Sequence, residues 1–284
     1  MIPAAFDYVT PSTVEEAVAA LAEAGEDAKV LAGGQSLLPV LRVRLAEPST
    51  VVDLGRIAEL RGVREDGDAI VIGAMTTHYE VRRDDLVRTH ARLLAEATAT
   101  VADPQIRHRG TFGGALAHAD PAGDLLAPVL ALDAELLIAG PDGRRTVPAS
   151  EFFVDLFTTA LAPDEVLVGV RVTKHTNWGA HYEKFNRVAQ AWSIVAVAAT
   201  IRAENGTIAE AKVALTNMGP TPIRASGVET ALVGGPATAE AIRNAAAHAA
   251  ESTQPVSDGN ADAAYREHLA RVLTARAIST AVGG

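Results

Sequence analysis

Residues 30–39 read VLAGGQSLLP, and the two glycines in this stretch, Gly33 and Gly34, raise the question that decides the fold. An apolar segment typical of a buried strand end runs directly into them, and a second apolar segment follows. Glycine at such a junction serves either a tight turn or the close approach of a negatively charged group to bare backbone N–H groups. The stretch alone is compatible with both interpretations.

The composition restricts the class of protein. The chain has 284 residues, 48% of them hydrophobic and 4% aromatic, so two or three domains packed on small aliphatic side chains are expected. A net charge of -10 argues against nucleic acid or an anionic membrane surface as a partner, since both require a positive face. The sequence contains no cysteine, which excludes disulfides, iron–sulfur clusters and thiol nucleophiles on this chain.

The sequence shows no secretory signal and no apolar run of the roughly 20 residues that a membrane span needs, so we expect a cytoplasmic protein without a transmembrane segment. The hydrophobic patterns predict an α+β fold in three parts, residues 1–56, 57–177 and 178–284.

The first part begins with the clearest helix of the chain, over residues 12–25, for which Ser12 and Glu15 form a capping-box pattern. Short strands over 29–32 and 50–54 complete this part. In the second part, Asp66-Gly67 predicts a hairpin, and helices are expected over 86–101 and 125–132. Strands are expected over 135–140 and 165–172.

The third part is predicted to contain three strands between residues 180 and 219, followed by a helical tail. Asn205-Gly206 is the strongest hairpin signal of the whole sequence.

A second glycine pair, Gly113-Gly114, lies in RGTFGGALAHADPAGD, a segment of turn composition. The two pairs can hold a diphosphate from both sides with bare N–H groups, helped by hydroxyls of Ser36 and Thr111, while Asp124 accepts a hydrogen bond from a ribose. The alternative is two ordinary turns. The Rossmann and Walker patterns are both absent, which disfavours the ordinary NAD and ATP folds.

Other residues give weaker signals. His118 and Asp120 come nearest to a metal-ligand pair, but no zinc motif is present, and no G-x-S-x-G elbow supports a hydrolase. Lys184 alternates with Tyr182 on a predicted strand, where it either faces solvent or places a cation near an electron-rich ring. Trp192 is most simply a core residue.

The sequence resembles the FAD-binding medium subunits of molybdenum hydroxylases, most strongly those of aerobic carbon monoxide dehydrogenases. The resemblance runs through the N-terminal segment IPAAFDYVTPSTVEEAVAALAEAGEDAKVLAGGQSLLPV, then VIGAMTTH, ADPQIRHRGTFGGALAHADPAGD, HYEKF and the helical tail. It implies a bipartite FAD-binding domain of the PCMH/VAO-like type, followed by a C-terminal domain with a three-stranded antiparallel sheet and helices.

The resemblance also implies roles for individual residues. Two loops would bind the FAD diphosphate, namely Ala32, Gly33, Gly34, Gln35 and Ser36, and Thr111, Phe112, Gly113, Gly114 and Ala115. Asp124 would contact the adenosine half, and Thr77 and Leu161 would lie at the flavin cleft. Lys184 would lie close to the isoalloxazine, and Trp192 stands where some members carry a tyrosine.

Three positions depart from the family pattern. Phe112 replaces the usual Ile, Ala115 replaces Asn or Ser, and Gln35 replaces a frequent His.

The function implied by the resemblance is electron transfer in a complex. Two [2Fe–2S] clusters on a small subunit would pass electrons to FAD on this chain, which would pass them to an external acceptor, and a large subunit would hold a molybdenum–pterin site. Two three-subunit units would form a dimer, located in the cytoplasm, either free or at the inner face of the membrane. The alternatives are a stand-alone flavin oxidoreductase and a ligand-binding or assembly module without redox turnover. Carbon monoxide is the substrate of the complex that the resemblance favours, with purines, nicotinate and aldehydes as the alternatives.

Overall fold

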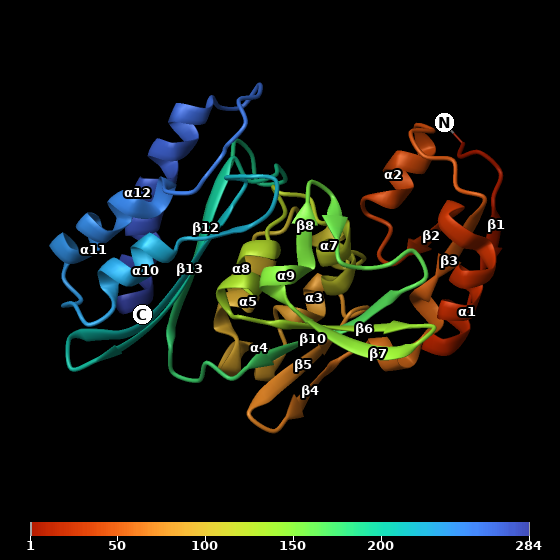
Figure 1. The fold of residues 1–284 in the computed structure, drawn as a ribbon, viewed down its shortest axis with the longest axis horizontal. Coiled ribbons are helices and arrows are strands. Elements are labelled where there is room, and N and C mark those ends of the chain that lie inside the picture. Colours follow the sequence, from red (N-terminus) through yellow and green to blue (C-terminus); the bar gives the residue numbers. More distant parts are fainter. Residues whose placement is uncertain (1, 284) are drawn as a thin grey trace.

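The computed structural model describes residues 2–283 and arranges them in three parts, each with its own sheet (Figure 1). In Figure 1 the N-terminal part lies on the right, the second part in the centre and the C-terminal part on the left. Helices and strands mix in every part, which confirms the predicted α+β class.

The first part is a small parallel sheet of strand order β1-β3-β2 with one long helix. Its elements are β1 (Asp7–Val9), α1 (Val14–Ala24), β2 (Ala28–Leu31), α2 (Leu37–Arg42) and β3 (Thr50–Asp53). The apolar residues Val14, Ala17, Val18 and Leu21 share the buried face of α1, which packs on β3 as well as on the second sheet. The helix cap differs from the prediction, because Thr13 rather than Ser12 accepts a hydrogen bond from the N–H of Glu16.

The second part is built on an antiparallel sheet of order β4-β5-β10-β6-β7. The strands are β4 (Val63–Asp66), β5 (Ala69–Gly73), β6 (Glu135–Gly140), β7 (Gly143–Pro148) and β10 (Val166–Thr173). A separate hairpin is formed by β8 (Phe153–Asp155) and β9 (Thr158–Thr159). The hairpin turn predicted at Asp66-Gly67 is confirmed by the pairing of β4 with β5.

Seven short helices belong to the second part: α3 (His78–Val81), α4 (Asp85–His90), α5 (Arg92–Ala99), α6 (Pro104–Arg107), α7 (Phe112–His118), α8 (Leu126–Ala131) and α9 (Ala149–Phe152). The single helix expected over 86–101 is two helices, because the backbone at Ala91 turns away from helical geometry with φ -142° and ψ 49°. The second glycine pair lies in the first turn of α7, where the sequence predicted only turn structure.

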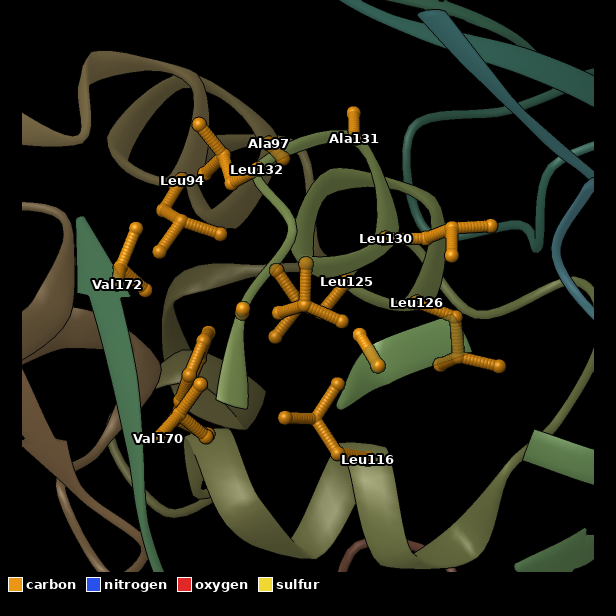
Figure 2. Packing of buried hydrophobic residues seen from close by; sticks show 14 of the residues in the cluster. Leu94, Ala97, Leu116, Leu125, Leu126, Leu130, Ala131, Leu132, Val170 and Val172 are labelled. Carbon is orange, nitrogen blue, oxygen red and sulfur yellow. The ribbon is translucent and has the colours of Figure 1, made fainter. Parts of the chain in front are cut away.

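The core of the second part lies between its sheet and its helices. Figure 2 shows Val170 and Val172 of β10 facing Leu94 of α5, Leu116 of α7 and the leucines of α8. The opposite face of the sheet is also covered, since Val166 and Val168 pack with α1 of the first part. The first two parts therefore share a hydrophobic core.

The third part is an antiparallel sheet covered by helices on one face. The three predicted strands are β11 (Gly179–Phe185), β12 (Val195–Glu204) and β13 (Thr207–Thr216), and a short β14 (Ile223–Arg224) pairs with β13. The helices are α10 (Ser226–Leu232), α11 (Ala239–Ala246) and α12 (Ala263–Gly283).

The two faces of this sheet have different partners. Side chains such as Val197 and Val213 pack under the helices, whereas Tyr182 and Ala198 join the core of the second part. Within residues 2–283, no helix has the length and apolarity to cross a membrane.

Candidate cofactor site

The first glycine loop connects β2 to α2 and leaves its backbone donors open. Gly34 has φ +77°, a conformation that side chains rarely adopt. Among residues 2–283, no protein acceptor takes the backbone N–H of Gly33, Gly34, Gln35 or Ser36. A run of N–H groups without acceptors, at a strand end, is the arrangement that binds an anionic group.

The second glycine segment is arranged differently. Thr111 caps α7 by accepting from the N–H of Gly114 at 3.2 Å. The N–H of Phe112 donates to the carbonyl of Thr76 at 2.9 Å, and the N–H of Gly113 donates to the carbonyl of Ala74 at 2.8 Å. The expectation of bare N–H groups from this second loop is therefore wrong. What it offers is the N-terminal end of a helix and the hydroxyl of Thr111.

The two glycine segments lie against each other. A Cβ on Gly33 would come within 2.3 Å of the carbonyl oxygen of Arg109 and 2.7 Å of the Cα of Gly110. A Cβ on Gly114 would come within 3.1 Å of the Cβ of Ala32. Gly33 is thus required for the contact between the loops, and Gly34 for the shape of the first loop.

A cavity of about 310 Å³ opens beside this contact. Four of the predicted site residues line it, namely Ala32, Gly113, Gly114 and Leu161. Its other walls come from β2, from α1 and from residues 159–167, so it lies between the first and second parts. Two charged side chains line the cavity and differ in their ionic partners. Glu165 forms an ion pair with Arg145 at 2.7 Å, and this contact lowers the pKa of Glu165. Lys29 has no ion-pair partner within residues 2–283.

Thr77 and His78 support the second loop. Thr77 caps α3 in a capping box with Glu80 and pairs with Thr111 in an isolated β-bridge. His78 donates its backbone N–H to the carbonyl of Gly110 at 2.9 Å, and a Cβ on Gly110 would meet the imidazole at 2.8 Å. Burial, with a smaller contribution from the charge of Arg107, lowers the pKa of His78 to about 4, so the ring is neutral at neutral pH. No pattern in the sequence indicates this role of His78.

The remaining predicted residues lie outside the cavity. Asp124 and Lys184 form a buried ion pair, with 2.7 Å between Oδ2 and Nζ. Trp192 is 55% exposed, which rules out a core position. The side chain of Phe112 is fully buried in the core of the second part and its backbone N–H donates to the carbonyl of Thr76, so neither group is open to a ligand. Ala115 packs at the edge of the same core.

Gln35 and Ser36 do not cap α2: the Gln35 side chain donates to the carbonyl of Gly33 at 3.3 Å, and the Ser36 hydroxyl makes no cap bond.

Sequence reasoning missed Tyr182 and Ser193, which both donate to Asp124. For these two donors, the only indication in the sequence was the alternation of Tyr182 with Lys184 along a predicted strand. Among residues 2–283, no group of three or more His, Cys, Asp or Glu side chains is arranged to hold a metal.

Comparisons with known proteins identify the family. Residues 4–174 match the family described as the FAD binding domain in molybdopterin dehydrogenase, and residues 180–281 match the CO dehydrogenase flavoprotein C-terminal domain. The chain belongs to the FAD-binding subunits of the molybdenum hydroxylases. It is 42% identical to the carbon monoxide dehydrogenase medium chain of Hydrogenophaga pseudoflava over 284 residues, 99% of this chain and 98% of the relative.

Other members of the family are similar over the full length. The xanthine dehydrogenase FAD-binding subunit of Escherichia coli O157:H7 is 31% identical over 280 residues, 97% of this chain and 95% of that subunit. A solved chain of the Hydrogenophaga pseudoflava carbon monoxide dehydrogenase superposes with a TM-score of 0.97 at 43% identity, covering 100% of this chain and 99% of that one. The family resemblance predicted from the sequence is confirmed.

The residues present fit FAD, the cofactor of this family of subunits. An anionic diphosphate requires open donors next to a close backbone approach, and the loop from Gly33 to Ser36 provides both. The cavity beside it offers the apolar walls of Val30, Leu54 and Leu161 to a flat ring.

Proposed function

We propose that this chain binds FAD between its first two parts and carries electrons within a molybdenum hydroxylase complex that oxidises carbon monoxide. The diphosphate would bind at the loops Ala32–Ser36 and Thr111–Ala115. The division 1–56, 57–177 and 178–284 is part of this proposal, with the first two parts forming the site. The observation that carries it is the contact of Gly33 with Arg109 and Gly110, which brings two loops distant in sequence to one cavity.

Each group of this chain has a defined task in that proposal. FAD, when bound, accepts single electrons and stores two of them. The open N–H groups of the first loop would neutralise the charge of the diphosphate. Thr77 and Leu161 would line the cleft, and the ammonium of Lys184 would stabilise negative charge on the flavin ring.

The partners follow from the absence of cysteine together with the family. With no cysteine, the chain has no thiolates to ligate an iron–sulfur cluster, so a small subunit carrying [2Fe–2S] clusters is the proposed donor and a large molybdenum subunit the site of substrate oxidation. Carbon monoxide as the substrate is supported by the names of two relatives, the medium chains of Hydrogenophaga pseudoflava and Afipia carboxidovorans. The dimer of three-subunit units and a cytoplasmic location, free or at the inner face of the membrane, stay predictions.

A titration of the full chain with FAD tests the cofactor site. Wild type should bind FAD and turn yellow, whereas Gly33→Ala should lose most of its affinity, because the new Cβ separates the loops. Gly259→Ala is the matched control, since a Cβ there meets nothing within 4 Å. Equal FAD binding by both variants would show that the loop contact does not form the site.

A second measurement tests the complex. In the complex purified with its partners, carbon monoxide should bleach the flavin absorption, and the isolated chain should show no reduction by carbon monoxide, purines, nicotinate or aldehydes. Turnover of one of these substrates by the isolated chain would support the stand-alone oxidoreductase instead. A chain that stays colourless in saturating FAD would support a module without redox turnover.

A further inference from the structure

A second, open groove of about 590 Å³ lies on the surface of the second part, and its lining residues differ from those of the cavity beside the glycine loops. One face of α4 and α5 forms most of its wall, and Arg82 at the end of α3 completes it. We call it the arginine groove, because Arg82, Arg88 and Arg92 line it together with Thr89. Figure 1 shows α4 and α5 on the side of the second part that faces the third part.

Two of the three guanidinium groups are poorly neutralised by this chain. Among residues 2–283, Arg82 has no carboxylate within ion-pair distance, and Arg88 lies 3.7 Å from Asp85, which is 95% exposed. A pair in such exposed positions contributes little. Burial and the neighbouring charge of Arg82 lower the pKa of Arg107, so positive charges crowd at this end of the groove. Crowded like charges make the approach of an anionic group favourable.

The third guanidinium is held in place from behind. Nε of Arg92 pairs with Oε1 of Glu96 at 2.8 Å, and Oε2 of Glu96 lies 3.2 Å from Nδ1 of His181 on β11. This chain therefore occupies both oxygens of Glu96. No hydrogen bond within the described residues uses the two terminal nitrogens of Arg92, which stay available to a partner.

The shape and chemistry of the groove favour a protein surface over a small molecule. Small-molecule sites enclose most of the ligand between mainly apolar walls. Here Arg88 and Arg92 are 64% and 49% exposed, and the lining is polar apart from Ala95 and Ala99. Permanent subunit interfaces bury large apolar areas, whereas transient encounters between redox proteins are smaller and depend on complementary charge. The arginine groove has the composition of the transient class.

The groove also lies close to the second glycine segment. Arg82 ends α3, and the residue that caps the start of this helix, Thr77, pairs with Thr111 in the isolated β-bridge. Five residues of helix advance by about 8 Å, so Arg82 is only about one and a half turns away from the pair with Thr111. A redox protein that binds in the groove would therefore be placed beside the proposed cofactor site.

We propose that the arginine groove is the docking site of the external electron acceptor, and that this acceptor is a one-electron redox protein with an acidic face. The inference rests on the proposed function, because it takes reduced FAD as the source of electrons. Two oxidised acceptor molecules dock in turn and each takes one electron, which accounts for the two electrons held by reduced FAD, and two protons pass to solvent.

The charge of the whole chain makes the groove selective. The sequence has 35 Asp and Glu residues against 25 Lys and Arg residues, so an acidic partner is repelled by the molecule as a whole. The three arginines provide a local exception to that repulsion, and they would direct such a partner to one place and one orientation.

The first test measures binding and needs no FAD. Plastocyanin, a copper protein with an acidic face, is titrated into the full chain at low and high salt. Wild type should bind it at low salt and release it as salt rises, because ions screen exposed charges. Arg82→Gln with Arg88→Gln should bind about tenfold more weakly at low salt. Arg243→Gln with Arg276→Gln is the matched control, since it removes the same charge from exposed positions on α11 and α12 and should bind as wild type does.

The second test measures electron transfer from the FAD-loaded full chain after anaerobic reduction. At low salt, the groove variant should reduce plastocyanin about tenfold more slowly than wild type and the control variant do. Benzoquinone, a small neutral acceptor that needs no docking surface, should be reduced at the same rate by all three proteins. Cytochrome c, a basic redox protein, should not be reduced more slowly by the groove variant.

Three results would overturn the inference. The first is plastocyanin binding that is absent in wild type or equal in the groove and control variants. The second is a parallel loss of benzoquinone reduction, which would mean that the variant damages the cofactor site. The third is loss of the iron–sulfur subunit from the complex purified with the groove variant, which would make the groove a permanent subunit interface. A wild-type chain that binds plastocyanin as expected but does not bind FAD would instead refute the proposed function.

Discussion

The two glycine pairs look alike in the sequence, but the structure requires glycine at each pair for a different physical reason. Gly34 supplies a backbone conformation, φ +77°, in a loop whose N–H groups have no protein acceptor. Gly113 supplies space, because a Cβ there would lie 2.4 Å from the Cβ of Ala74, and its N–H donates to the carbonyl of the same residue. One pair keeps donors open for a ligand, and the other packs a helix start against β5.

This difference shows that a glycine motif predicts the position of a site better than it predicts the role of each glycine in that site. Gly33 belongs to the open loop, yet its absent side chain is needed for packing against Arg109. The comparison predicts that substitutions in the second segment damage folding, whereas a substitution in the first loop can damage ligand binding with less damage to the fold.

The largest effect is expected for Gly113→Ala. The new Cβ would overlap Ala74 at its Cβ, Cα and carbonyl oxygen, and the backbone cannot move away without breaking the Gly113 N–H bond to that carbonyl. We expect a loss of about 3 kcal/mol or more in the free energy of unfolding, at the upper end for overpacking. Denaturant unfolding of the FAD-free chain measures it. A variant of wild-type stability would mean that α7 can shift and that the second segment is not a packed one.

His78 is expected to make the free energy of unfolding depend on pH, by an amount similar to the loss expected for Gly113→Ala. Its pKa falls from an ordinary 6.5 to about 4 on folding, so between these values the unfolded chain binds the proton more readily. The free energy of unfolding should therefore decrease by ~3 kcal/mol in all as the pH falls from 6.5 to 4. Above pH 6.5 it should keep its full value.

His78→Phe, which cannot titrate, measures that contribution as the difference between two pH profiles of unfolding. Because the imidazole packs on Gly110, this variant tests whether the second segment depends on a neutral buried ring. Parallel profiles for wild type and variant would refute the prediction.

Local patterns predicted much of the fold. Asn205 and Gly206 have φ of 50° and 79°, the geometry that an Asn-Gly hairpin requires, and Gly25 ends α1 with φ 71°. The cap of α1 was displaced by one residue because STVEE contains two equivalent registers, and only packing selects Thr13 with Glu16. The break at Ala91 has no marker in the sequence.

The site was predictable only in part, because its contacts are distant in sequence. Two glycines in one turn cost a helix about 1 kcal/mol each, so the sequence predicts a turn where α7 forms. The cap by Thr111 and the burial of Phe112 and Leu116 outweigh that cost. The hydrogen bonds from Phe112 and Gly113 to residues 74–76, and the pair of Asp124 with Lys184, depend on the tertiary fold and have no local signature.

The smallest effect on folding is expected for Gly34→Ala, which sharpens the comparison most. The left-handed conformation costs a side chain about 1–2 kcal/mol, and the Cβ would meet only side-chain atoms, those of Leu38 from 2.9 Å and the Cδ1 of Leu31 at 3.4 Å. Gly67→Ala is the matched control, since Gly67 has φ +60° with nothing within 4 Å of a Cβ. The two variants should lose similar stability in denaturant unfolding, but only Gly34→Ala should lose FAD affinity in a titration, because only there does a changed backbone turn the open N–H groups away from the ligand. Equal FAD affinity in the two variants would mean that the conformation of Gly34 serves the turn alone.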